Sequence, residues 1–227
     1  MLRDEKAIGT VSTWTDELYS SRMFRHVEFL LNELSLRIEE FDLFAVAAGP
    51  GSFTGLRVGL AAVKGWAEVH RKPIGAISGL EAIAVQSHSG AAVLAPVLDA
   101  RRGQLYFGIY RRTGAPDEER LELEGEESVM TPDEFIAAVQ ARKGNSDFAI
   151  VTPVPELISG ALSRCETDHA HGGPIPVDEV SAILAPHIGR LGYLRAQRGE
   201  LTDSLTLDAN YVRRSDAELH WKAPSGS

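Results

Sequence analysis

Apolar residues in the first part of the chain alternate between helical spacing and the unbroken runs of buried strands. Those within Lys6–Val11 predict a short strand, and those from Phe24 to Ile38 recur at helical spacing, which predicts a helix of about four turns. Leu43–Ala48 is a continuous apolar run of strand length, as expected of a strand covered on both faces. A second helix is predicted from Gly55 to His70, because Pro73 stops the pattern soon afterwards.

The alternation continues through the rest of the chain and predicts an α/β layer. The expected elements are an extended piece at Ile74–Ile77, a helix at Gly79–Ser87, a strand at Ala92–Leu98, a hairpin at Gln104–Arg111, a helix from Thr131 to Arg142, a strand at Phe148–Thr152, a short helix at Pro155–Ser163, and a last helical stretch from Asp178 to Gly199 that Pro186 breaks or kinks. The helix at Thr131 has a specific start signal, since Thr131-Pro132-Asp133-Glu134 combines a capping box with proline at the first helical position. A shift in composition near Gly90 predicts two lobes, residues 1–89 and 90–227.

Composition and charge narrow the class of protein. The chain has 227 residues, of which 44% are apolar and 24% charged, so it can bury a sizeable core without disulfides. Its single cysteine, Cys165, favours a reducing compartment. A net charge of −9 gives no general attraction to nucleic acid or to an anionic membrane. No apolar run has the length of a membrane span and Met1–Lys6 does not start a secretory signal, so we expect a soluble, cytoplasmic protein.

The loop Gly49-Pro50-Gly51-Ser52-Phe53-Thr54-Gly55 lies between a predicted strand and a predicted helix, where backbone N–H groups can hold an anion. Its glycine spacing differs from the dinucleotide fingerprint, no Lys-Ser/Thr pair follows Gly55, and Ser52 does not lie in a nucleophile elbow. Two interpretations stay open. The glycines either permit a tight turn and close helix–strand packing, or Gly51, Ser52 and Gly55 contact an anion.

Other reactive side chains give weaker signals. The histidines lack a pair at the spacing of four that a helical metal site needs; they are His26, His70, His88, His169, His171, His187 and His220. Cys165 is predicted to be an unreactive, half-buried thiol. Asp99 with Arg101 and Arg102 indicates either a charged turn with an ion pair or a catalytic cluster, and acidic Asp117–Glu127 predicts a solvated loop or edge strand. We therefore predict neither catalytic nor metal-binding residues.

Small residues follow one another at helical spacing on the predicted helix after the glycine loop. Gly55, Gly59 and Ala62 allow another helix to approach closely, and Trp66 lies one turn further on. This stripe fits either packing within the lobe or a subunit interface.

Several of these segments together resemble the bacterial TsaB (YeaZ) family. The run Ala47-Ala48-Gly49-Pro50-Gly51-Ser52-Phe53-Thr54-Gly55-Leu56-Arg57-Val58-Gly59 closely resembles the family signature. The similarity continues through Ala61–Gly65, the Pro73 break, Ile77–Ala84, Asp99–Tyr106, and Asn210–Arg213 followed by Ala217-Glu218.

The resemblance implies an α/β protein with the two-lobed, actin-like ATPase superfamily fold (ASKHA, ribonuclease H-like). It implies a non-catalytic subunit of the complex that makes N6-threonylcarbamoyladenosine in tRNA, binding and supporting the transferase TsaD, with TsaE in the wider complex and a homodimer as an alternative assembly. The isolated chain would hold no cofactor, ATP would bind only at the level of the complex, and tRNA would be contacted only indirectly. The implied interface lies on the two first-lobe helices, at Phe24, Val27, Leu31, Gly55, Gly59, Ala62, Val63 and Trp66. The glycine loop is then mainly a turn that positions the interface helix.

One departure from the family concerns the start of the chain. The family's first strand, with its remnant of a phosphate loop, has no counterpart before Met1-Leu2-Arg3-Asp4. We expect a first lobe that lacks this strand, with an exposed sheet edge and weaker grounds for nucleotide binding, explained by a mis-assigned start codon or a truncation. Two other classes stay open: a glycoprotease-like hydrolase (M22-type) and a relative of sugar or acetate kinases.

Overall fold

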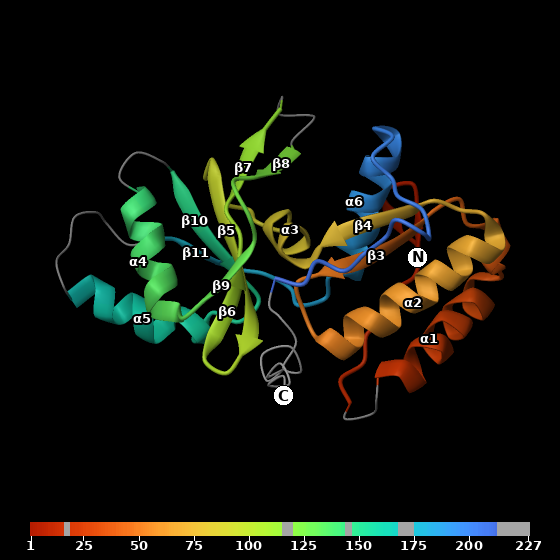
Figure 1. Ribbon diagram of the computed structural model, residues 1–227, viewed down its shortest axis with the longest axis horizontal. Helices are drawn as coiled ribbons and strands as arrows, with labels where there is room; N and C mark the ends of the chain where they lie inside the picture. Colours follow the sequence, from red (N-terminus) through yellow and green to blue (C-terminus); the bar gives the residue numbers. More distant parts are fainter. Residues whose placement is uncertain (16–18, 115–119, 144–146, 168–174, 213–227) are drawn as a thin grey trace, which may run out of the picture.

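The computed structural model describes residues 1–15, 19–114, 120–143, 147–167 and 175–212, and their helices and strands form two groups that lie side by side (Figure 1). In the first group β3 (Phe44–Gly49) pairs in parallel with β4 (Ile74–Ser78). Helix α2 (Phe53–His70) covers one face of this pair and α6 (Ala185–Gln197) covers the other. Helix α1 (Tyr19–Leu34) packs against α2.

The second group is built on a seven-stranded mixed sheet in which β11, β10, β5, β6 and β9 are successive neighbours. Strand β7 pairs with β5 and with β8. The bounds of its strands are β5 Val93–Arg101, β6 Gln104–Phe107, β7 Tyr110–Thr113, β8 Arg120–Leu123, β9 Ser128–Met130, β10 Phe148–Thr152 and β11 Val177–Glu179. The remaining elements are β1 Leu2–Arg3, β2 Lys6–Ala7, the 3₁₀ turn η1 Ile38–Glu40, α3 Gly79–Ala84, α4 Pro132–Lys143 and α5 Glu156–Thr167.

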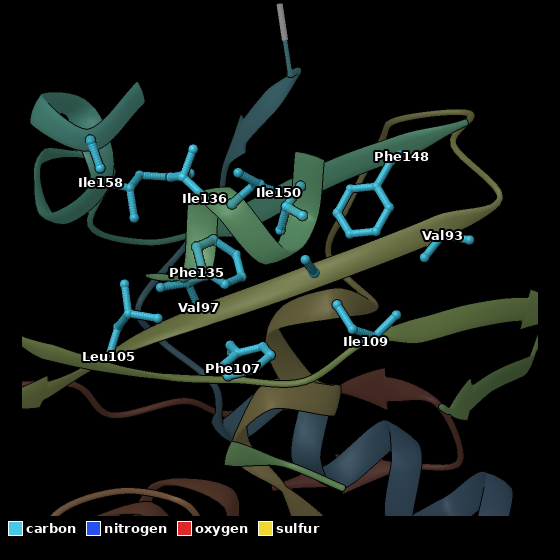
Figure 2. Packing of buried hydrophobic residues seen from close by; sticks show 13 residues of the cluster. Val93, Val97, Leu105, Phe107, Ile109, Phe135, Ile136, Phe148, Ile150 and Ile158 are labelled. Carbon is cyan, nitrogen blue, oxygen red and sulfur yellow. The ribbon is translucent and has the colours of Figure 1, made fainter. Parts of the chain in front are cut away.

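Alternation along the central strands distributes apolar side chains to both faces of the large sheet. Val93 and Val97 of β5 contact α4 and α5 on one face, where Phe135 is fully buried (Figure 2). Leu94, between them, lies on the other face with Leu80 of α3. The capping box predicted at the start of α4 is present, because the Thr131 and Glu134 side chains each accept a hydrogen bond from the other residue's backbone N–H.

Helix α6 comes from the end of the described chain but packs against the first group. Ile188 and Leu191 lie with Ile77, and the backbones approach closely at two glycines. A Cβ added at Gly75 would lie 2.9 Å from the Cα of Gly192, so this contact needs glycine. The division of the chain at residues 89 and 90 stays a prediction; in the structure, residues 185–212 lie beside β3 and β4.

Three predicted elements are wrong in extent or type. The strand at Lys6–Val11 is only two residues long, and the helix expected at Phe24–Ile38 is α1, which ends at Leu34 because Ser35 adopts a positive φ of 51°. The last helical stretch does not start at Asp178, since Val177–Glu179 is strand β11, paired in parallel with β10. Pro186 occupies the first turn of α6 and starts that helix instead of breaking it.

Candidate functional site

The glycine loop turns the chain sharply from β3 into α2. The backbone of Gly49 has a φ of +124°, and a Cβ added there would lie 2.5 Å from the carbonyl oxygen of Asn210. Ser52 is the N-cap of α2, and its hydroxyl accepts a hydrogen bond from the Gly55 N–H at 3.4 Å. The Ser52 side chain therefore serves the helix start, and anion contact at Gly51, Ser52 and Gly55 stays a prediction.

A large apolar groove runs along the same end of the first group. Its volume is about 1420 Å³, and its walls come from the start of the chain, α1, α2, β3 and α6. Most of the predicted interface residues line it: Val27, Leu31, Gly55, Gly59, Val63 and Trp66. At Gly59 an added Cβ would make only ordinary contact, 3.8 Å from Val46, so the groove has room above this residue.

Aromatic rings join the two helices beside the groove. Phe24 of α1 lies edge-on to Trp66 of α2 with ring centroids 5.9 Å apart, and the ring centroid of Phe44 in β3 lies 6.0 Å from that of Trp66. Half of the Phe24 surface remains exposed (50%), whereas Val63 is buried among the core residues under α2. Ala62 is half-buried on α2 and does not belong to the groove lining. The structure therefore brings the predicted interface residues into one neighbourhood, with Val63 serving mainly the core.

The groove includes an open edge of β3. The Phe44 N–H donates to the Pro73 carbonyl on the β4 side, so by alternation the backbone groups of Ala45 and Ala47 point to the opposite edge. Within the described ranges, β3 pairs with β4 alone. This exposed edge is the feature expected from the sequence.

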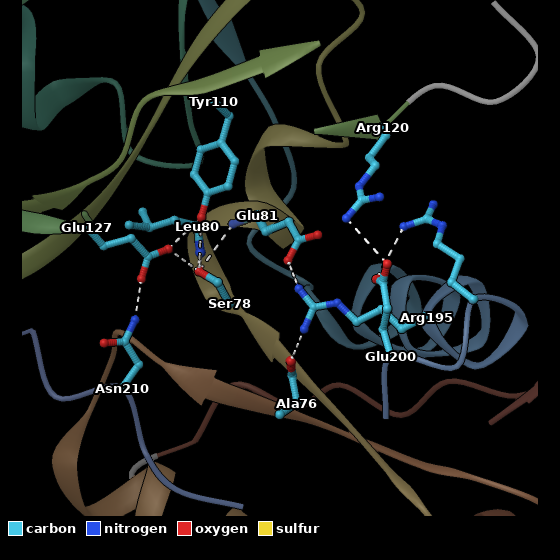
Figure 3. Close-up of polar contacts among 11 residues, drawn as sticks. Ala76, Ser78, Leu80, Glu81, Tyr110, Arg120, Glu127, Arg195, Glu200 and Asn210 are labelled. Atoms are coloured by element: carbon cyan, nitrogen blue, oxygen red, sulfur yellow. Dashed lines mark hydrogen bonds and ion pairs between the residues drawn. The ribbon is translucent and has the colours of Figure 1, made fainter. Parts of the chain in front are cut away.

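A polar cluster centred on Glu127 joins the two groups of elements (Figure 3). The Tyr110 hydroxyl donates to Glu127 Oε1 at 2.6 Å, and the Ser78 hydroxyl donates to the same oxygen. Asn210 Nδ2 donates to Oε2 at 2.6 Å. Both carboxylate oxygens are thus occupied by donors of this chain, as in a structural cross-link.

Burial dominates the electrostatics of this cluster. It raises the pKa of the Glu127 carboxyl, which is 9% exposed, although the hydrogen bonds from its donors act in the opposite direction. The pKa of Tyr110 is also raised, first by burial and then by the neighbouring Glu127 charge. Tyr110 therefore remains a neutral hydrogen-bond donor at physiological pH.

A second polar contact lies on the α6 side of α3. Arg195 bonds to Glu81 at 2.5 Å and also donates to the Ala76 carbonyl, which ties α6 to both α3 and β4 (Figure 3). Burial raises the pKa of Glu81, and the charge of Arg195 opposes this shift. Nearby, Arg120 of β8 and Arg198 approach the Glu200 carboxylate at 3.3 and 3.7 Å.

Residues 207–212, here called the strap, cross the end of β3 after α6. Leu207 is buried in the core of the first group, and the Asn210 N–H donates to the Ala48 carbonyl at 2.7 Å. The Tyr211 ring lies 5.4 Å from Phe53 at the start of α2. Its hydroxyl accepts a hydrogen bond from Arg57 Nε at 3.2 Å, and the Arg57 guanidinium lies 3.8 Å from the centre of the Phe53 ring.

Sequence reasoning did not find the Glu127 cluster. The acidic segment Asp117–Glu127 was expected to be solvated, and β8 within it is an edge strand; Glu127, however, is buried by partners far away in the sequence. Residues 115–119 of that segment lie outside the described residues. The resemblance at Asn210-Tyr211 was the one signal that pointed to this region, whereas Arg213, Ala217 and Glu218 lie outside the described residues.

The remaining chemical candidates occupy ordinary structural positions. Asp99 and Arg101 form an ion pair at 3.2 Å at the end of β5, beside the turn to β6, which fits the charged-turn interpretation. Cys165 is half-buried on α5 in contact with Gln140, and His169, His171 and His220 lie outside the described residues. In the part of the chain that the structure describes, no three His, Cys, Asp or Glu side chains are grouped as in a metal site. None of the described helices is both long and apolar enough to cross a membrane.

Comparisons with known proteins agree with this architecture. A family model described as TsaD: tRNA N6-adenosine threonylcarbamoyltransferase matches residues 4–157. The chain is 35% identical over 111 residues to the tRNA threonylcarbamoyladenosine biosynthesis protein TsaB of Bacillus subtilis (strain 168), covering 49% of this chain and 48% of that protein. It is 29% identical over 96 residues to the protein of the same name from Escherichia coli (strain K12), with 41% and 42% covered. The chain spans less than half the length of these curated relatives in the matched regions.

A solved structure extends the likeness over most of the chain. YeaZ from Pseudomonas aeruginosa superposes with a TM-score of 0.65 at 25% identity, covering 86% of this chain and 84% of that chain. The actin-like α/β fold predicted from the sequence is thereby confirmed.

Proposed function

Because the chain belongs to the family described by the TsaD model, and within it to the TsaB (YeaZ) proteins, we propose that it is a non-catalytic subunit in the synthesis of N6-threonylcarbamoyladenosine in tRNA. Its role is to bind the transferase TsaD and to support the active conformation of that partner. The observation that carries this proposal is the apolar groove and aromatic cluster along α1 and α2.

The groove and its rim have the features of a docking surface. Its walls are apolar, and Phe24 and Trp66 are large rings that can be buried against a partner without much loss of side-chain entropy. Gly55 and Gly59 leave space at which a partner's side chains can approach the α2 backbone. A partner helix or strand that fills this space would bury apolar surface that the chain alone leaves in contact with water.

Bulky, charged substitutions on α2 test the proposal. Gly59→Arg places a long cationic side chain in the groove, and Ala62→Arg places one on the adjoining helix surface, so we expect both to lose co-purification with TsaD. Gly65→Arg is the matched control, because Gly65 lies exposed on the same helix with nothing within 4 Å of an added Cβ. Circular dichroism melts of all three variants establish that they are folded. If folded Gly59→Arg and Ala62→Arg bind TsaD as the unsubstituted chain does, the interface assignment is wrong.

The wider assembly forms part of the same proposal. A net charge of −9 disfavours direct tRNA contact, so a partner holds the RNA. TsaE and ATP join only at the level of the complex, and the α1–α2 face serves either TsaD or a second copy of this chain. Light scattering of the isolated chain and of Ala62→Arg distinguishes these uses, because a homodimer on this face becomes monomeric in the variant. A cytoplasmic location accompanies this role.

A catalytic role is the second candidate, favoured by the match to a transferase family model over residues 4–157. Transfer of the threonylcarbamoyl group to tRNA by the purified chain, in the absence of TsaD, would establish it. Activity that requires added TsaD supports the non-catalytic role.

A further inference from the structure

Two adjacent residues of the strap contact different parts of the fold: Asn210 bonds to Glu127, and Tyr211 contacts the start of α2. Asn210 reaches toward Glu127 in the loop before β9, at 2.6 Å (Figure 3). Tyr211 turns to the first turns of α2, where it contacts Phe53 and Arg57. A displacement of Asn210 therefore carries Tyr211 with it.

The strap is also held against the glycine loop through its backbone. The Asn210 N–H donates to Ala48, and its carbonyl oxygen lies over Gly49, where no side chain could fit. Both of these contacts are made by one residue, Asn210. The side-chain bond to Glu127 adds a third contact at Asn210, to a different part of the fold.

Glu127 is a firm anchor for such a bond. Its other oxygen is held by Tyr110 of β7 and Ser78 at the β4–α3 junction, and Ser78 in turn accepts the N–H of Leu80 at 3.0 Å. The carboxylate is thus fixed to both groups of elements before Asn210 is considered. A hydrogen bond from an amide to a buried carboxylate is stronger than one between neutral groups.

We propose that Asn210 is a positioning residue: its bond to Glu127 fixes the strap so that Tyr211 and Arg57 are held at the start of α2, beside the groove. The contacts that join the two groups of elements at Glu127 thereby control the start of α2, the helix proposed to dock the partner. The last step, from the helix end to partner binding, rests on the proposed function. Tyrosine and arginine are among the residue types that contribute most strongly to binding when a partner buries them.

An exchange of donor and acceptor across the bond provides the test. Asn210→Asp places two carboxylates together and breaks the bond at neutral pH. The double variant Glu127→Gln with Asn210→Asp restores it with reversed polarity, because the glutamine amide donates to the introduced carboxylate. Glu127→Gln alone is the control, since the Asn210 amide can rotate and present its oxygen to the glutamine NH₂.

The readout is backbone hydrogen exchange of the isolated chain, measured by mass spectrometry. We expect exchange over residues 53–60 to accelerate in Asn210→Asp by about tenfold to a hundredfold, the change that loss of one hydrogen bond to a charged group produces. Residues 64–70 at the far end of α2 and the α4 helix should exchange as before, which separates this effect from general destabilisation. The double variant should return residues 53–60 to the rate of the unsubstituted chain. The proposal is overturned if Asn210→Asp accelerates exchange only within the strap, or if the double variant fails to reverse the effect at α2.

Affinity for TsaD is measured on the same variants. Weaker binding by Asn210→Asp and recovery in the double variant support the link to docking, and unchanged binding by Asn210→Asp refutes that link. A chain that never binds TsaD refutes the proposed function instead, whereas the exchange experiment still decides the role of Asn210.

Discussion

Replacing Gly49 by alanine tests the structural interpretation of the glycine loop. The residue lies at the end of β3 with a φ of +124°, a conformation that residues with a side chain rarely adopt. The added methyl group would also meet backbone, with the Asn210 oxygen at 2.5 Å and its carbonyl carbon at 3.3 Å. Both effects act on the folded state alone.

The expected loss follows from these two contributions. A non-glycine residue held in such a conformation costs about 1–3 kcal/mol. Overpacking against atoms that cannot rotate away costs about 1–3 kcal/mol more, and the stiffer unfolded chain offsets about 0.4–1 kcal/mol. We therefore expect the free energy of unfolding to fall by about 2–5 kcal/mol, a large part of the ~5–15 kcal/mol typical of a domain.

Urea titrations followed by circular dichroism measure this loss, and an unchanged m-value shows that the two states are comparable. Gly51→Ala is the matched control in the same loop, because no atom lies within 4 Å of its added Cβ. We expect that control to change stability by less than about 1 kcal/mol. The reasoning is refuted if the two substitutions cost the same, or if Gly49→Ala costs less than about 1 kcal/mol.

Three further predictions concern the caps and buried charges. Thr131→Ala removes the hydroxyl that accepts the Glu134 N–H, so a urea titration should show a loss of about 1 kcal/mol; an unchanged midpoint would contradict the capping role. Arg195→Ala leaves the 13%-exposed Glu81 side chain without its guanidinium, with an expected loss of about 2–4 kcal/mol, and adding Glu81→Gln should recover part of it if the unpaired charge is the cause. Burial raises the pKa of Glu127 above its ordinary 4.5, so above pH 4.5 the folded state binds more protons than the unfolded chain. Stability therefore falls as pH rises from 4.5 through the raised pKa. As pH rises above 4.5, Glu127→Gln should therefore lose less stability in urea titrations than the unsubstituted chain, and parallel losses would contradict a raised pKa at Glu127.

Local signals in the sequence were sufficient for much of the fold. Strand β3, helix α2 and the start of α4 depend on neighbouring residues: an unbroken apolar run, a glycine turn with a serine cap, and a capping box. The local structure that each of these patterns favours is the one that the complete fold contains. The α1–α2 face was found through the family resemblance, and its aromatic contacts are consistent with it.

The elements that sequence reasoning missed depend on distant partners. Val177–Glu179 is too short and polar to indicate a strand by itself, and it forms because β10 offers a parallel edge. Glu127 resembles its acidic neighbours in sequence, yet it is buried because Ser78, Tyr110 and Asn210 converge on it in space. The contact between Gly75 and Gly192 joins residues far apart in the chain, so their spacing carries no helical or strand periodicity.

The return of α6 to the first group has a consequence for how the protein is made. Helix α6 covers β3 and β4 but begins more than 100 residues after β4 ends. At about 5–20 residues per second, the ribosome needs roughly 5–20 s to synthesise the intervening chain. During that time the face of Ala45 and Ile77 lacks the cover of Ile188 and Leu191, although Ala82 of α3 is already present. The strands that are synthesised first are therefore among the last to complete their folding.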